Sequence, residues 1–415
     1  MIESIQFYLS QQGSFLFAQV EKLSPDLENF LQKLFSSEDI KITGEFTRHA
    51  ETIDMLEFVI PFSEKEIIDK IEPLKEFLFL EKTVDSISYQ YNEGIKIKLY
   101  PTEGSELLKK VFDTTGSEVF VSAFNRDFPN ISFRGSGNDE DIFKRAGIQY
   151  IPPYLRESES IISFSAQNKI PEVIQPGDIK GIIHCHSKWS DGINTLEELA
   201  EACIKSGKEY LVISDHSKAA TYAHGLNEEK IKEQHMLIDE LNEKLNPFKI
   251  FKSIESDILN DGYLDYSNSV LSTFDLVIAS VHSNLKMNEE KAMTRLLNAI
   301  EHPYTTILGH MTGRLLLSRK GFPVDHKKII DACAENKVVI EINAHPSRLD
   351  IRWQWIEYAL SKNILFSINP DAHSIPEFEN TKYGVLVAQK AMVTTRNNLS
   401  SFSLKEFEKY LSDRH

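Results

Sequence analysis

The stretch GIIHCHSKWSDG places two histidines, His184 and His186, one residue apart and follows them with Asp191. Residues i and i+2 of an extended strand point to the same face, so both imidazoles would lie on one side and Cys185 on the other. Imidazole and carboxylate groups, with no thiolate required, are ligands suited to Zn, Mn or Fe. We therefore interpret this stretch as one part of a divalent metal site whose other ligands come from distant segments.

Histidines and acids also end most of the other short apolar runs in the second half of the chain. These positions are His184 and His186 with Asp191, Asp215 with His216, Glu255 with Asp257, His282, His310, and Asp371 with His373. The run VVIEINA, residues 338–344, is the exception. A single histidine at a strand end is more often a hydrogen-bonded core or rim residue than a ligand. Six of the 13 histidines at equivalent strand ends, together with acids, favour a shared metal site over core packing.

The elements that must position these residues follow a β-then-α rhythm from residue 179 onward. Apolar runs such as YLVISDH alternate with amphipathic stretches at 195–207 and 288–301, a pattern typical of parallel βα units. Seven strand-like runs predict a βα barrel or an open doubly wound sheet, and no GxGxxG or GxxxxGKS/T motif indicates a nucleotide cofactor. In a barrel the C-terminal strand ends converge on one face, which would make these distant residues neighbours.

The composition limits the function classes. The chain has 415 residues, a formal net charge of −16 and no basic run, which disfavours a nonspecific nucleic-acid clamp, although several divalent ions in one acidic cleft would reverse its local sign. Its three cysteines, Cys185, Cys203 and Cys333, form no CxxC pair and indicate a reduced protein. The N-terminus lacks a basic segment followed by an apolar one, and no apolar run approaches the roughly 20 residues that span a bilayer. We expect a cytoplasmic protein with no membrane partner.

Three regions are expected along the chain. Residues 1–149 indicate an α+β domain, because helical stretches alternate with strand-like runs such as MLEFVIPF and IKIKLY. Residues 150–178 carry prolines at 152, 153, 171 and 176 with little periodicity, which predicts an interdomain linker. Residues 179–415 contain the βα units and would form the α/β barrel.

The HCH motif and the segments SDH, IESD, SVH, LGH and PDAH resemble the motifs of the PHP (polymerase and histidinol phosphatase) superfamily. The resemblance implies a distorted seven-stranded βα barrel that holds three divalent metal ions. By this resemblance one ion is held by His184, His186, Glu255 and Asp371, a second by Glu255, His282 and His310, and a third by Asp191, His216 and His373. Asp215 is expected to orient His216 through a hydrogen bond.

Such a centre implies phosphoester hydrolysis, because cations a few ångströms apart activate water near neutral pH and stabilise the phosphoryl and leaving oxygens. A substrate phosphate also needs fixed positive donors. Arg314 and Arg348 fall just beyond strand ends on the same predicted face, and Lys188 follows the HCH motif. Pairing of these arginines with nearby acids such as Asp350 is the alternative interpretation. His345 is either a phosphate donor or a rim residue, and the sequence identifies no protein general acid.

A closer resemblance extends over residues 150–415. The segments YIPPYLRE, GHMTGRLLL, INAHPSRLD and YGVLVAQ look like the C-terminal half of bacterial family X DNA polymerases. In that family a PHP domain follows the polymerase core and is associated with 3′-end processing of DNA. The resemblance therefore implies a DNA-directed phosphoesterase.

The region 1–149 resembles the polymerase palm of the same family only weakly. The palm's serine aligns with Glu45, its paired aspartates with Met55 and Glu57, and its third carboxylate with Lys98. Two-metal nucleotidyl transfer needs carboxylates at those points, and methionine and lysine do not hold a hard cation. We expect a degenerate polymerase-like domain whose polymerase site is inactive.

Two enzymatic functions remain, from different substrate classes. The first is a metal-dependent 3′–5′ exonuclease or DNA 3′-end processing enzyme, favoured by the closeness of the C-terminal resemblance. The second is a small-molecule phosphatase of the histidinol-phosphatase kind, favoured by the net charge and the lost polymerase site. A noncatalytic interaction module would leave the whole set of metal-type residues without a role. The sequence leaves open which metals bind, the protein partners and the oligomeric state.

Overall fold

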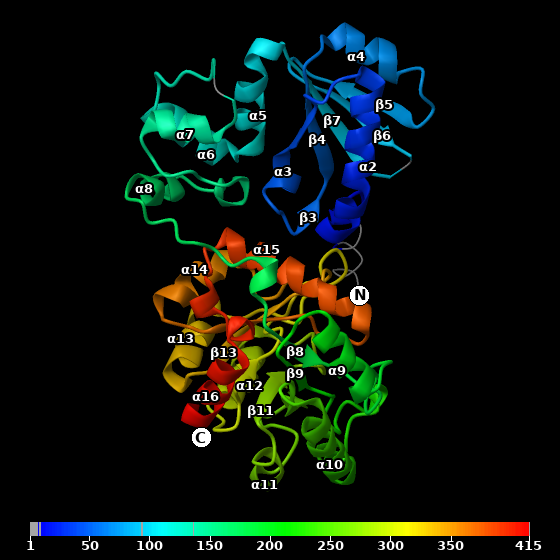
Figure 1. Cartoon of the computed structure of the whole chain (residues 1–415), viewed down its shortest axis with the longest axis vertical. Coiled ribbons are helices and arrows are strands. Elements are labelled where there is room, and N and C mark those ends of the chain that lie inside the picture. The colour runs from blue at the N-terminus through cyan, green and yellow to red at the C-terminus, as the bar shows by residue number, and fades with distance from the viewer. Residues whose placement is uncertain (1–6, 8–9, 93, 136, 415) are drawn as a thin grey trace. The chain divides into compact units, whose positions relative to one another are not determined.

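The structure is a computed structural model that describes residues 7, 10–92, 94–135 and 137–414. The chain divides into two compact units, Met1–Pro171 and Glu172–His415 (Figure 1). No helix in the described ranges is long and apolar enough to cross a membrane. The N-terminal segment, on which the expectation of a cytoplasmic chain partly depends, falls mostly outside the described residues.

The first unit is built on a five-stranded sheet in the order β2-β4-β7-β6-β5. Its central strands β4 and β7 run parallel, and the other neighbours are antiparallel. The strands of this unit are β1 (Phe15–Leu16), β2 (Lys41–Thr43), β3 (Thr52–Ile53), β4 (Met55–Ile60), β5 (Phe77–Lys82), β6 (Ile87–Tyr91) and β7 (Lys96–Pro101). Its helices are α2 (Phe17–Phe35), α3 (Gly44–Thr47), α4 (Glu64–Ile71), α5 (Leu107–Thr115), α6 (Glu118–Asp127), α7 (Glu140–Ala146) and α8 (Ser160–Ala166).

The stretch 150–178, expected as a linker, carries helix α8 and two short 3-10 helices, Pro153–Leu155 and Pro176–Asp178. The boundary between the two compact units falls within it, after Pro171. Prolines start both 3-10 helices, where the fixed φ of the ring suits the first helical position.

The second unit contains seven parallel strands, and neighbours in the sheet are neighbours along the chain. The strands are β8 (Gly181–Cys185), β9 (Tyr210–Ile213), β10 (Lys249–Asp257), β11 (Leu276–Ser280), β12 (Ile307–Leu308), β13 (Val339–Asn343) and β14 (Phe366–Asn369). A parallel bridge between Cys185 and Ala372 joins the end of β8 to the residues just after β14. The sheet therefore nearly closes, and the prediction of a seven-stranded PHP-type βα barrel in a mixed α/β chain is confirmed.

Helices follow the barrel strands and pack against them (Figure 1). They are α9 (Leu196–Lys205), α10 (Glu228–Leu245), α11 (Asn268–Leu271), α12 (Glu289–Ile300), α13 (His326–Asn336), α14 (Trp353–Ser361), α15 (Thr381–Lys390) and α16 (Leu404–Arg414). Polar residues set where several of them begin. Asn227, Asn288 and Asp325 each accept a hydrogen bond from a backbone N–H in the first turn of α10, α12 and α13.

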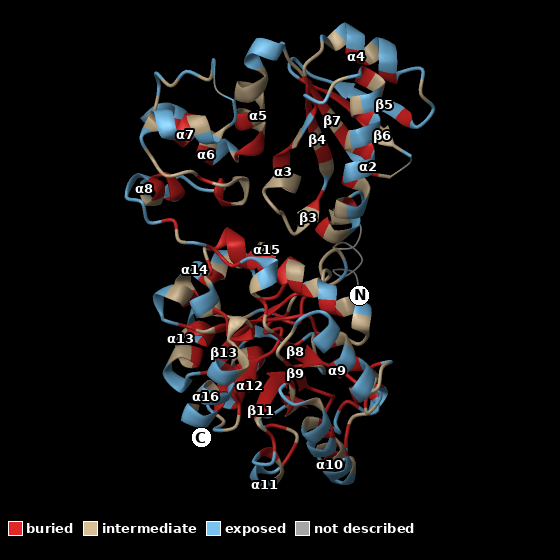
Figure 2. Cartoon of the chain, viewed as in Figure 1, coloured by how far each residue is buried: buried red, intermediate tan, exposed pale blue. Residues whose placement is uncertain are grey.

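The barrel interior is apolar toward the N-terminal ends of the strands and polar toward their C-terminal ends. The labelled strands β8, β9 and β11 are buried throughout (Figure 2). Phe407 and Leu411 of α16 belong to one buried cluster with Tyr210 at the start of β9, and the Tyr210 and Phe407 rings stack with their centroids 4.5 Å apart. Helix α16 thus fills the barrel at the N-terminal ends of the strands. The polar C-terminal strand ends are left as the place where a reaction can occur.

Candidate metal centre

The metal-type side chains predicted from the strand ends gather at the C-terminal end of the barrel. Three overlapping groups have ligand atoms within 4.8 Å of one another: His186, Asp191, His216 and His373; His184, His186 and Asp371; and His216, Glu255 and His282. His310 joins them, because its Nε2 lies 3.0 Å from Glu255 Oε1. All nine predicted residues are therefore brought into one cluster.

His184 in β8 and His186 just after the strand are presented through a local irregularity. The pairing of β8 with β9 shifts register between Ile182 and Cys185, and His184 has a φ of +63°, in the left-handed region that residues with a side chain rarely adopt. Cys185 packs in the apolar cluster outside, while His184 and His186 both reach the metal-type cluster. A bulge of this kind re-aims side chains beside functional sites. The opposite directions predicted for histidines and cysteine agree with the structure, but the bulge was not predicted.

Glu255, at the end of β10, is the carboxylate with most histidines around it. Its side chain is fully buried. Five imidazoles lie around its two oxygens, at 2.9 Å for His216 Nδ1, 3.0 Å for His310 Nε2, 3.2 Å for His282 Nε2, 3.3 Å for His184 Nε2 and 3.7 Å for His186 Nε2. A carboxylate with ligand-type nitrogens on both oxygens is suited to bridging two cations.

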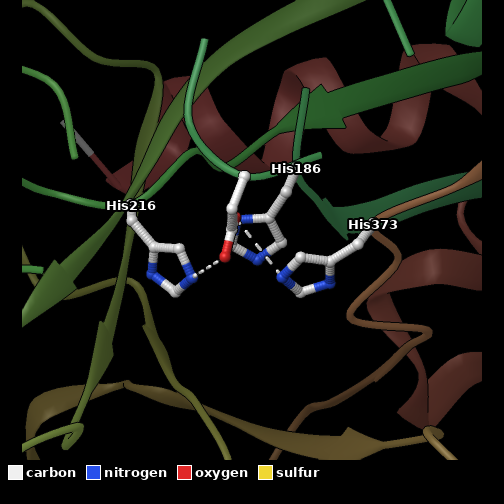
Figure 3. Close-up of side chains that lie close together, drawn as sticks. His186, His216 and His373 are labelled. Atoms are coloured by element: carbon white, nitrogen blue, oxygen red, sulfur yellow. Dashed lines mark ion pairs between the residues drawn. The ribbon is translucent and has the colours of Figure 1, made fainter. Parts of the chain in front are cut away.

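Two aspartates serve the flanks of the same cluster. Asp371 Oδ1 lies 3.4 Å from His184 Nε2 and 3.3 Å from His186 Nε2. On the other flank Asp191 lies 3.6 Å from His216 Nε2 and 3.5 Å from His373 Nε2. Figure 3 shows this flank, with His186, His216 and His373 pointing toward one another. Asp371 has a φ of +51°, so a second cluster residue adopts the left-handed region.

The electrostatics of the cluster favour ionised carboxylates. Burial alone would raise the pKa of Glu255, but the neighbouring His282, His184 and His216 hold it well below its ordinary value. The pKa of Asp371 is likewise lowered, against burial, chiefly by His184. Burial, with the charge of His216, lowers the pKa of His186 to about 3. Against the effect of burial, the neighbouring carboxylates raise the pKa of His184 well above its ordinary value, that of His282 to about 10 and that of His373 to about 9. Protonated imidazoles therefore carry positive charge where cations would bind. Metal binding requires neutral imidazoles, so a bound cation would displace these protons and be held by ionised carboxylates.

The side chains of the cluster fit divalent cations on an observation independent of their spacing. Within the described residues, both ring nitrogens of His186, Nε2 of His184, Nδ1 of His310 and Oε2 of Glu255 are buried and make no hydrogen bond. An unpaired buried polar group costs about 1–3 kcal/mol. So many unpaired ligand atoms converging on one place are explained if cations bind among them.

Glu341 was missed by the sequence analysis, although it is central to the site. This fully buried carboxylate lies in the middle of β13, 2.6 Å from His184 Nδ1, and it accepts hydrogen bonds from His310 N at 2.6 Å and from Asn369 Nδ2 at 3.0 Å. It fixes the ring of His184 so that Nε2 faces Glu255 and Asp371. The only signal in the sequence was an acid inside the apolar run VVIEINA, where a buried charge requires partners.

Asp257 supports His282 in a similar way, since its Oδ1 lies 3.3 Å from His282 Nδ1. Asp215, in contrast, does not have the hydrogen bond to His216 that was expected. It accepts hydrogen bonds from Ser187 N at 2.7 Å, Ser190 Oγ at 2.5 Å and Gln234 Nε2 at 2.6 Å. Asp215 therefore holds in place the turn that follows the HCH motif, and this turn leads to Asp191.

The four predicted phosphate donors have different surroundings. Arg314 is 3% exposed and donates to the backbone carbonyls of Arg348, at 2.8 Å, and Leu349, so its guanidinium holds the neighbouring turn. Arg348 is beside the cluster, with Nε 3.4 Å from Asp371 Oδ2. His345 is half-buried and its Nδ1 lies 2.8 Å from Ser347 Oγ. Lys188 is exposed. Arg348 is the donor that the structure brings to the cluster.

The polymerase-like positions lie on the sheet of the first unit. Met55 and Glu57 are two residues apart on β4, and Glu57 and Lys98 are directly paired between β4 and β7. The hydroxyl of Tyr100 donates to Glu57 Oε2 at 2.6 Å. An acid, a lysine and a methionine thus occupy the face where the palm of family X polymerases was expected to have three carboxylates.

Comparison with known proteins agrees with this fold and this cluster. Residues 183–345 match the family model described as PHP domain. The barrel, its cluster of histidines and acids and this match define a PHP-type, metal-dependent phosphoesterase. Over 417 aligned residues the chain is 32% identical to the DNA polymerase/3′-5′ exonuclease PolX of Bacillus subtilis (strain 168), an alignment that covers 94% of the chain and 71% of that relative. The chain therefore belongs to the PolX family of bacterial family X polymerases with a PHP domain, as the sequence motifs predicted.

Other similar proteins match a smaller part of the chain. A probable phosphatase of Caldanaerobacter subterraneus subsp. tengcongensis is 26% identical over 168 residues, which cover 39% of the chain and 60% of that protein. Among solved structures, the histidinol phosphate phosphatase of Lactococcus lactis, complexed with zinc, L-histidinol and phosphate, is similar with a TM-score of 0.39 and 17% identity, covering 51% of the chain and 94% of that structure.

Proposed function

We propose that this chain removes nucleotides or blocking groups from the 3′ ends of DNA, as a 3′–5′ exonuclease or 3′-end processing phosphoesterase. The observation that carries hydrolysis is the gathering of nine metal-type side chains, the buried Glu255 among them, in one cluster. DNA as the substrate is supported by the similarity to the B. subtilis polymerase/exonuclease, because that similarity extends over 94% of the chain.

We assign three cations, Zn, Mn or Fe, to the three groups of residues. His184, His186, Glu255 and Asp371 would hold the first; Glu255, His282 and His310 the second; and Asp191, His216 and His373 the third. When bound, such cations make water nucleophilic near neutral pH and stabilise the charge that develops on phosphoryl oxygens. Imidazole and carboxylate donors accept all three metals, and their availability decides among them.

The protein's own groups position these ligands and the substrate. Glu341 sets the ring of His184 and Asp257 sets the ring of His282, and partners of this kind orient ligands in metal sites. Arg348 is placed to bind a substrate phosphate, because its guanidinium lies beside Asp371 at the edge of the cluster. Arginine binds phosphate oxygens through paired N–H donors.

We propose further that the polymerase site of the first unit is inactive. Two-metal nucleotidyl transfer needs a set of carboxylates that hold both cations. Here Met55 offers no oxygen atom to bind a hard cation. Lys98 lies opposite Glu57 on the neighbouring strand, and its positive charge would repel a cation there. Hydrolysis at DNA ends would then be an activity that the PHP barrel performs without nucleotide addition.

A small-molecule phosphatase of the histidinol-phosphatase kind is the second candidate. Two observations favour it: the formal net charge of −16, and the similarity of the barrel to proteins named probable phosphatases. Such an enzyme would release phosphate from a soluble monoester and would leave DNA intact.

The test compares both substrate classes in one preparation. Protein loaded with Mn²⁺ or Zn²⁺ is incubated with a 5′-labelled DNA strand and, in parallel, with histidinol phosphate and sugar phosphates. We expect stepwise shortening of the DNA. His186→Ala should abolish it, while His302→Ala, a histidine outside the cluster, should retain it. Phosphate release from a small ester alone would overturn the DNA assignment, and full activity of His186→Ala would overturn the metal centre.

A further inference from the structure

A tyrosine beside the metal-type cluster has no role in the chemistry described above. Tyr222 lies in the loop between β9 and α10, and 67% of the residue is exposed. Its ring centroid is 6.2 Å from that of His216, at an interplanar angle of 57°. Among the described residues Tyr222 makes no hydrogen bond and no other ring contact. One face of a large aromatic side chain is therefore left open next to a residue assigned to the third cation.

The loop that carries Tyr222 is held firmly at its base. Ala220 and Ala223, which precede and follow Tyr222 in the sequence, are each 1% exposed and anchor the loop in the protein. Leu226 N donates to His216 O at 2.9 Å, which ties the end of the loop to the residue assigned to the cation. A Cβ at Gly225 would lie 1.9 Å from Ser217 O, so the two sides of the loop approach closely. The exposed ring is thus presented by an ordered backbone.

The contact with His216 places Tyr222 at the edge of the cluster, because His216 itself lies 3.6 Å from Asp191 and 2.9 Å from Glu255. A tyrosine phenol has an ordinary pKa of about 10 and is neutral near neutral pH. Its ring is therefore an uncharged flat surface close to the metal-type side chains. A substrate that brings its phosphate to this cluster would bring its adjoining group close to the ring.

We propose that Tyr222 stacks on the terminal nucleobase of the DNA strand and so positions the adjoining phosphodiester at the metal centre. This inference rests on the function proposed above and extends it to a substrate with a planar base. Every base has a π-face, so stacking on an aromatic side chain is tolerant of sequence, as removal of successive terminal nucleotides requires. Tyr222 is then a positioning residue that favours nucleotides over phosphates without a ring.

The test uses two DNA strands that differ only at the 3′ terminus, where one ends in an ordinary nucleotide and the other in an abasic tetrahydrofuran residue. For the ordinary strand, we expect Tyr222→Ala to raise KM by roughly tenfold. Tyr222→Phe should keep the wild-type KM, because the ring is retained. For the abasic strand, wild type and Tyr222→Ala should have the same KM. Tyr263→Ala is the matched control, since Tyr263 is also exposed, at 66%.

Each other outcome decides against the inference. Equal KM values of the wild type for both strands, an equal loss by Tyr222→Ala on both, or a loss in Tyr222→Phe as large as that in Tyr222→Ala would overturn stacking while leaving the proposed function intact. Bound metal is measured for every variant. If Tyr222→Ala binds less metal than the wild type, its higher KM is explained by a disturbed His216, and this result also overturns stacking. If the wild type shortens neither strand, both the inference and the DNA assignment fail, whatever it does to histidinol phosphate.

Discussion

The two units of the chain surround their central carboxylates with different side chains. In the barrel, nine metal-type side chains gather in one cluster, and Glu255 is fully buried among five imidazoles. In the first unit, Glu57 lies opposite Lys98 in the backbone register of β4 and β7, and its carboxylate accepts a hydrogen bond from the Tyr100 hydroxyl. This contrast is the basis of our proposal that the first unit performs no nucleotide transfer, because a lysine there occupies a position where a cation-binding carboxylate would be needed. In the barrel cluster, by contrast, both ring nitrogens of His186 and Nε2 of His184 are buried and make no hydrogen bond within the described residues.

The largest effect should come from the centre of the barrel cluster. Glu255→Gln keeps the size of the side chain but removes the charge, so it should lower kcat for phosphoester hydrolysis by more than about a hundredfold, beyond the effect typical of groups that only orient ligands. Metal analysis should show less bound cation, while circular dichroism stays unchanged. A variant with normal activity and metal content would remove the basis for contrasting the two units.

The next effect concerns a residue that the sequence did not reveal. Glu341→Gln keeps a possible acceptor for His184 but removes the negative charge, so metal affinity or activity should fall by about 10- to 100-fold. Titration with Mn²⁺ and steady-state kinetics measure the two. Equal values for the variant and the wild type would mean that Glu341 serves the packing of β13 alone.

Replacement of two arginines should affect different properties, stability for Arg314 and substrate binding for Arg348. Arg314→Ala removes donors to buried carbonyls and should lower the free energy of unfolding by about 1–3 kcal/mol in denaturant titration. Arg348→Ala should instead raise KM and change stability little. The reverse pattern would restore the original expectation that Arg314 binds phosphate.

The smallest effect is expected in the first unit. Lys98→Ala should change hydrolysis by less than about twofold, since no cation is assigned there, and nucleotide incorporation should be undetectable in both proteins. The comparison is sharpened by Met55→Asp combined with Lys98→Asp, which restores carboxylates at both positions and should increase Mn²⁺ binding by the first unit. Incorporation of nucleotides by the unmodified chain would show that the palm-like site still works.

Much of the barrel could be predicted because its signals are local. Seven strand-like runs, all but VVIEINA ending in histidine or acid, predicted the seven strands, and the common direction of parallel strands predicted that their ends would meet. Glu341 escaped this reasoning because it lies within a strand rather than at its end. The roles of Asp215 and Arg314 were also hidden, since Ser187, Gln234 and the carbonyl of Leu349 become their partners only in the folded chain. Sequence spacing predicts which residues meet, but not which hydrogen bonds each one makes.

The seam of the barrel has a mechanical consequence. His186 N donates to Ala372 O at 2.8 Å and Ala372 N donates to His184 O at 3.2 Å, so the first and last strands meet between residues assigned to the cations. His184 and His186 come from one side of this seam, and Asp371 and His373 from the other. Cations held there would add links between the first and last strands to those that the backbone already makes. Removal of the cations by a chelator should therefore lower the free energy of unfolding as well as abolish hydrolysis, because a ligand that binds only the folded state stabilises it.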